Sequence, residues 1–172
     1  MIFPRQKLYN VPLFGIFFKS LFLSKKTSFI PLENVRSLLK LPTNYYFSFT
    51  PFARVGIHLA IKFAIKNNSG KKVLLSSFTI RDIKNMVLSA GGEPVFIDHK
   101  KNSMDLDYGL LKKNIEENQQ RFCALILTHY AINQNDLTKI VELCKKHKVF
   151  LIQDCSIALG STFLKKPIYL YG

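Results

Sequence analysis

From about residue 43 onward, short apolar runs alternate with segments whose apolar positions recur every three or four residues. The short runs are typical of buried strands, and the periodic segments are typical of amphipathic helices. Strands are predicted at Tyr45–Phe49, Val73–Leu75, Pro94–Ile97, Phe122–Leu127 and Val149–Ile152. Helices are predicted at about Phe52–Lys66, from about Ile83 to Gly91-Gly92, from Asp107 to about Asn118, and from Asp136 past Cys144.

Two of these helices have clear apolar faces. Ile83, Met86, Val87 and Ala90 follow the i, i+3, i+4, i+7 pattern, and so do Leu137, Ile140, Val141 and Cys144. Strands that are apolar on both faces, alternating with such helices, predict an α/β fold: a mostly parallel sheet with helices on both faces.

The first 42 residues differ from this pattern and are expected to form an apolar arm and helix, with the α/β domain at 43–172. Leu8–Leu23 is strongly apolar, but Asn10, Pro12 and Lys19 interrupt it, and it is too short for a spanning helix. With Lys25-Lys26 behind it, it could lie on a membrane surface. The favoured alternative is an arm that packs on another subunit or on another part of the same protein.

The chain has 172 residues and a net charge of +14, which raises the question of a polyanionic partner. The lysines occur as scattered pairs along the whole chain and not as one stripe, so a solvated lysine-rich surface is favoured over nucleic-acid binding. Cys123, Cys144 and Cys155 form no CxxC pair and lie in or beside apolar runs, which fits a reducing cytoplasm. The sequence indicates no metal site.

Polar residues follow the predicted strands, where ligands bind in open α/β sheets. They are Ser76-Ser77, Thr128-His129 and Gln153-Asp154, and a helix begins beside them at Ala53-Arg54. His129 is expected to be a hydrogen-bonded structural residue, whereas Asp154 is costly to bury without a partner. The sequence contains neither GxGxxG nor GxxxxGK[ST], so dinucleotide and P-loop sites are not predicted.

Three segments together resemble the DegT/DnrJ/EryC1/StrS family of pyridoxal-phosphate (PLP) sugar aminotransferases. Ser77-Phe78-Thr79 with the later AGGEPVFID (90–98) is similar to the family's SFT…AGATPVFVD. THYA (128–131) followed by Asp136-Leu137 is similar to VHxxGxxxDM, and LIQDCSIALG (151–160) to VIEDAAQAxG. The resemblance covers roughly residues 45 to 162 and implies part of a fold-type-I PLP transferase large domain.

The resemblance also implies roles for five residues in cofactor binding. Asp154 matches the aspartate that pairs with the pyridinium nitrogen, which helps the ring to draw electrons from the substrate. Ala53 and Arg54 stand at the family's Gly-Thr position, where backbone N–H groups meet the phosphate. Ile80 replaces an aromatic residue stacked on the ring, and Ile157 replaces a Gln or His that hydrogen-bonds the cofactor hydroxyl.

No residue of this chain is expected to be catalytic. In the family, the Schiff-base lysine lies downstream of the segment matched by residues 151–160, and Lys165 and Lys166 match a surface hairpin instead. The chain is therefore expected to be an N-terminal fragment of a nucleotide-sugar aminotransferase homologue, inactive alone. The alternatives are a non-catalytic scaffold, paired in a homodimer or with a full-length homologue, and a basic membrane-surface protein.

Overall fold

The computed structural model describes residues 36–37, 39, 41–46, 48–117, 122–130 and 135–171, and the chain divides into two units, 1–46 and 47–172. In the first unit the guanidinium of Arg36 donates to the carbonyl oxygens of Pro42 at 2.7 Å and Tyr45 at 2.9 Å. The apolar stretch Leu8–Leu23 lies outside the described residues. The expected arm and its boundary after residue 42 therefore stay predictions.

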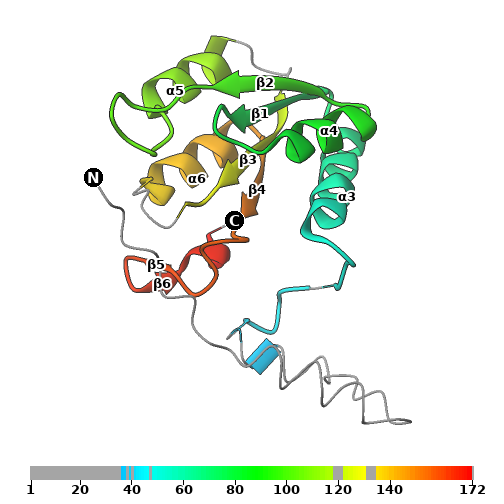
Figure 1. Cartoon of the computed structure of the whole chain (residues 1–172), viewed down its shortest axis with the longest axis vertical. Coiled ribbons are helices and arrows are strands. Elements are labelled where there is room, and N and C mark those ends of the chain that lie inside the picture. The colour runs from blue at the N-terminus through cyan, green and yellow to red at the C-terminus, as the bar shows by residue number, and fades with distance from the viewer. Residues whose placement is uncertain are drawn as a thin grey trace. The chain divides into compact units, whose positions relative to one another are not determined.

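The second unit is built on a four-stranded parallel sheet with the order β2-β1-β3-β4 (Figure 1). The strands are β1 (Lys72–Ser76), β2 (Glu93–Ile97), β3 (Phe122–Thr128) and β4 (Phe150–Asp154). They confirm four of the five predicted strands. Because all four run the same way, their carboxyl ends lie along one edge of the sheet.

The strand predicted at Tyr45–Phe49 is wrong, since its described residues (45, 46, 48 and 49) belong to no strand. Tyr46 is fully exposed and Phe49 is 61% exposed. A strand is stable only when a neighbour pairs its backbone groups and covers its apolar side chains. The aromatic pattern alone could not show whether such a neighbour exists.

Helices cover both faces of the sheet, as predicted (Figure 1). On one face α3 (Ala53–Lys66) and α4 (Arg81–Ser89) bury Ile61 and Val87 against β1 and β3. On the other face α5 (Tyr108–Glu117) and α6 (Leu137–Lys146) bury their apolar sides. The residues that α5 and α6 bury there are Leu111, Ile115, Leu137, Ile140, Leu143 and Cys144.

The expected helix ends are also confirmed. The Oδ1 atoms of Asp107 and Asp136 accept hydrogen bonds from the backbone N–H groups of Leu110 (3.0 Å) and Lys139 (3.3 Å), so both aspartates cap their helices. After α4 the chain turns at Gly91, whose φ of +86° lies in the left-handed region. None of the helices in the part of the chain that the structure describes has both the length and the apolar character needed to cross a membrane.

After β4 the chain forms the hairpin of β5 (Thr162–Phe163) and β6 (Lys166–Pro167), followed by the short 3-10 helix η1 (Ile168–Leu170). Lys165 is in the turn of this hairpin and Lys166 begins β6, which confirms that both lysines belong to a surface hairpin. Ile168 of η1 is buried in the same apolar cluster as α5 and α6.

Candidate functional site

One pocket at the carboxyl edge of the sheet collects all five residues that the resemblance singles out. Its volume is about 340 Å³, which falls within the roughly 300–1,000 Å³ typical of small-molecule sites. Segments from α3, α4, β3 and β4 meet there. The lining residues are Phe52, Ala53, Arg54, Ile57, Thr79, Ile80, Asp82, Ile83, Thr128, Tyr130, Asp154, Ser156 and Ile157.

The amino end of α3 forms one wall of this pocket. The N–H groups of Val55 and Gly56 both lie near the carbonyl oxygen of Phe52, at 3.0 and 3.4 Å, whereas Phe52 offers no capping side chain. Ala53 and Arg54 therefore carry the first N–H groups of the helix, which have no intrahelical acceptor. Together with the helix dipole and the Arg54 guanidinium, they make this end of the pocket suited to an anion.

Asp154 lies at the carboxyl end of β4, next to Thr128 of β3 in the strand register. Its Oδ1 accepts hydrogen bonds from the backbone N–H of Ser156, at 3.1 Å, and from the Ser156 hydroxyl. The backbone N–H of His129 donates to the Asp154 carbonyl oxygen at 2.9 Å, which fixes the backbone of Asp154. The half-buried carboxylate thus has the partner that its burial requires, and Asp154 lines the pocket.

Two isoleucines line the same pocket with unusually exposed side chains. Ile80, just before α4, is 66% exposed, and Ile157, just after β4, is 64% exposed. Ile57 and Ile83, which are buried, also line the pocket. A pocket with exposed apolar side chains beside a carboxylate suits a flat ring that carries one polar atom.

Thr79 and Tyr130 also line this pocket, although sequence reasoning gave neither of them a role there. The Thr79 hydroxyl is buried and has no hydrogen-bond partner among the described residues, which fits a polar group of a ligand. The Tyr130 hydroxyl donates to the Phe78 carbonyl oxygen at 2.9 Å, and burial raises the pKa of this hydroxyl, with a further contribution from Asp154. Both residues lie in segments that carry the family resemblance, Thr79 in 77–79 and Tyr130 in 128–131, and this was the signal available for them.

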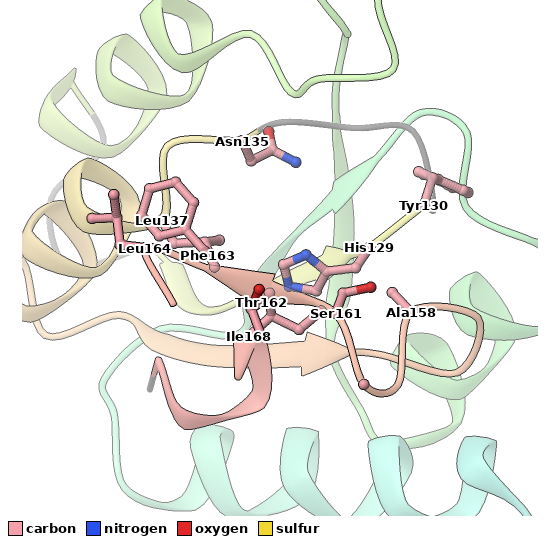
Figure 2. A pocket seen from close by; sticks show the side chains of 11 residues that line it. His129, Tyr130, Asn135, Leu137, Ala158, Ser161, Thr162, Phe163, Leu164 and Ile168 are labelled. Carbon is pink, nitrogen blue, oxygen red and sulfur yellow. The ribbon is translucent and has the colours of Figure 1, made fainter. Parts of the chain in front are cut away.

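The polar residues that follow the strands do not all reach the same pocket. Thr128 and Asp154 reach the pocket, whereas Ser77 lines a separate hollow with His99 and Asp105. His129 lines another cavity of about 660 Å³, and Figure 2 shows it among side chains that come partly from β5 and the residues before it.

The contacts of His129 are those of a structural residue. It is 4% exposed, and its Nε2 lies 3.0 Å from Oε1 of Gln153. Burial lowers the pKa of its imidazole. The expectation that His129 is hydrogen-bonded is therefore confirmed.

Known protein structures share the fold described above. Helicobacter pylori PseC, an aminotransferase involved in the biosynthesis of pseudoaminic acid, matches with a TM-score of 0.57 and 27% identity over 67% of this chain and 30% of that chain. The sugar aminotransferase CalS13 from Micromonospora echinospora shares the fold, with a TM-score of 0.60 at 20% identity over 69% of this chain and 33% of that one. The fold is thus part of a fold-type-I PLP-dependent aminotransferase large domain.

Residues 52–171 match the model of the DegT/DnrJ/EryC1/StrS aminotransferase family, and the chain belongs to that family. It is 31% identical over 116 residues to UDP-4-amino-4-deoxy-L-arabinose–oxoglutarate aminotransferase of Shewanella sediminis, covering 67% of this chain and 29% of the relative. It is 26% identical over 118 residues to GDP-perosamine synthase of Escherichia coli O157:H7, covering 69% and 31%. The chain spans a little under a third of the length of these relatives.

Proposed function

We propose that this chain forms the cofactor-binding part of a PLP-dependent nucleotide-sugar aminotransferase that works in amino-sugar or cell-surface polysaccharide biosynthesis. The observation that carries the proposal is the single pocket lined by Ala53, Arg54, Ile80, Asp154 and Ile157. The two curated relatives support a sugar nucleotide as the substrate class. The family resemblance supports an amino acid, typically glutamate, as the amino donor.

Each of these residues has a defined task in the proposed complex. The Asp154 carboxylate accepts a hydrogen bond from the pyridinium nitrogen and keeps that nitrogen protonated. The amino end of α3 and the Arg54 guanidinium bind the phosphate. Ile80 packs on the ring, and Ile157 lies beside the ring hydroxyl, to which it cannot donate a hydrogen bond. When bound, PLP supplies an electron sink for the carbon that carries the amino group.

We further propose that the 172-residue polypeptide binds the cofactor but does not transfer amino groups by itself. No lysine is among the described residues that line the pocket. Amino transfer requires an amine that bonds covalently to the cofactor and moves a proton. The described residues of the pocket therefore supply orientation and binding, and none of them supplies that amine.

The test is a calorimetric titration of the purified chain with PLP, comparing Asp154→Asn with Asp98→Asn. Asp98 provides a matched control because it also follows a strand but lines the separate hollow beside His99. A hydrogen bond to a charged group contributes about 1.5–3 kcal/mol. Asp154→Asn should therefore weaken binding by about tenfold to a hundredfold, and Asp98→Asn should leave it unchanged.

Failure to bind PLP, or equal affinity in the two variants, would overturn the assignment of the pocket. The proposed inactivity is tested separately, by mixing the chain with PLP, glutamate and a keto-sugar nucleotide. Amino transfer without any added protein would overturn it.

We also propose that the chain pairs with a second copy of itself in the cytoplasm. Exposed Leu59 and Phe63 on α3 support the pairing, because they form an apolar surface with Phe150, whose ring packs edge-on against Phe63 at 5.5 Å. The three free thiols, of which Cys123 and Cys144 are buried, support the location. A monomeric mass by light scattering at micromolar concentration would contradict the pairing, and an oxidised, disulfide-bonded native protein would contradict the location.

A further inference from the structure

An ion pair joins the amino ends of two helices at the proposed phosphate end of the pocket. Nη1 of Arg54, the second residue of α3, lies 3.1 Å from Oδ2 of Asp82, the second residue of α4. The Arg54 guanidinium carbon also lies 4.9 Å from the centre of the Phe52 ring. All three residues line the pocket. Arg54 is therefore held by an internal anion at the position where an external anion is expected.

The ion pair itself is easy to break. The side chains of Arg54 and Asp82 are 49% and 50% exposed, and exposed pairs of this kind contribute little to stability because water screens them. A phosphate monoester, by contrast, carries up to two negative charges and matches the planar donors of a guanidinium. A phosphate that reaches the first turn of α3 can therefore take Arg54 from Asp82 at small cost.

Once displaced, Asp82 becomes an unfavourable neighbour. Its carboxylate remains on the pocket wall, where it repels the phosphate charge. It is also the acidic residue in the first turn of α4, whose N-cap Ile80 offers no side-chain cap. The helix dipole of α4 therefore keeps Asp82 close to this end of the pocket.

We propose that Asp82 is an internal competitor for Arg54 and lowers the affinity of the pocket for the cofactor phosphate. This inference rests on the proposed function, because it requires the phosphate to bind at the amino end of α3. The Arg54–Asp82 ion pair would then regulate how much of the site is occupied. The ion pair would thus weaken cofactor binding, so that the site empties when the cofactor concentration is low. An anionic ligand would have to replace the Asp82 carboxylate at Arg54.

The experiment measures the affinities of PLP and of pyridoxal, which lacks the phosphate, by calorimetry. Asp82→Asn should bind PLP about three- to tenfold more tightly than the wild-type chain, because Arg54 no longer has to leave an internal anion and the phosphate no longer meets that carboxylate. Its affinity for pyridoxal should not change. Asp98→Asn is the matched control, since it removes the same charge from the separate hollow. Far-UV circular dichroism confirms that each variant is folded.

The Arg54→Gln background distinguishes competition from simple charge repulsion. If Asp82 acts by holding Arg54, the gain from Asp82→Asn should become smaller when Arg54 is replaced by Gln. An equal gain in both backgrounds would overturn the inference. So would PLP binding that is the same in the wild-type chain and in Asp82→Asn, although the proposed function would then stand. Absence of PLP binding in every variant would overturn both.

Discussion

Buried Ser76 and the half-buried ring of His99 should be energetically coupled, because a hydrogen bond joins the carboxyl ends of two adjacent strands through them. Ser76 is the last residue of β1 and is 2% exposed, and His99 follows β2. Oγ of Ser76 lies 2.6 Å from Nε2 of His99, whose Nδ1 lies 2.8 Å from the Met104 carbonyl oxygen. Since a carbonyl oxygen only accepts, Nδ1 carries a hydrogen toward Met104, and Nε2 makes the contact with the Ser76 hydroxyl.

The magnitude follows from the hydrogen bonds that each substitution removes. Ser76→Ala removes the bond to His99 and the bond from the Phe78 N–H to Oγ, at 3.2 Å. His99→Phe keeps an aromatic ring against Phe78 but removes the bonds to Ser76 and Met104. At about 0.5–1.5 kcal/mol for each bond, either variant should lose roughly 1–3 kcal/mol of unfolding free energy.

The assay is a double-mutant cycle based on urea unfolding followed by circular dichroism. Because the two substitutions remove one shared bond, the double variant should lose less than the sum of the single losses, by about 0.5–1.5 kcal/mol. Ser77→Ala is the control, as an exposed neighbour whose loss should stay within about 0.5 kcal/mol. A coupling energy no larger than the additivity error of about 0.3 kcal/mol would refute the reasoning.

Two further predictions concern the core and its pH dependence. Leu125→Ala, at a fully buried position of β3, should lower the free energy of unfolding in urea by about 2–5 kcal/mol. Leu159→Ala is the control, because Leu159 is 67% exposed. Similar unfolding midpoints for the two variants would contradict the prediction. Burial lowers the pKa of His129 below its usual 6.5, so the unfolded chain binds more protons than the folded chain when the pH is below this value. The free energy of unfolding should therefore decrease as the pH drops below about 6.5. His129→Gln should make the fall from pH 7.5 to 5.5 shallower, and an unchanged slope would argue against this origin.

Much of the fold could be predicted because its strands are unbroken apolar runs and its helices have one apolar face. Phe122–Leu127 is apolar on both faces, which predicts a strand buried on both sides, and the structure places it between β1 and β4. Tyr45–Phe49 shows the limit of this reasoning, because its aromatic residues satisfy a strand pattern while the pairing depends on a neighbour that the pattern does not encode. Side-chain burial likewise differed in α6, where Leu143 is buried and Val141 is only half-buried.

For the candidate site, the motifs were sufficient to single out five residues that the structure brings into one pocket. Their roles stay predictions until binding is measured. The pairs Arg54–Asp82 and Ser76–His99 could not be predicted, because each joins side chains from segments that are distant in the sequence. Their geometry depends on how α3 meets α4 and how β1 meets β2, which no local pattern specifies.

The parallel order of the strands makes ligand binding and completion of the fold interdependent. The pocket wall takes Ala53 from the first helix of the second unit and Ile157 from beyond its last parallel strand, so the site exists only after β4 has docked beside β3. A ligand that binds only the finished pocket stabilises the whole sheet in proportion to its concentration and affinity. For the proposed cofactor PLP, its supply in the cell would then influence how much of this protein escapes proteolysis.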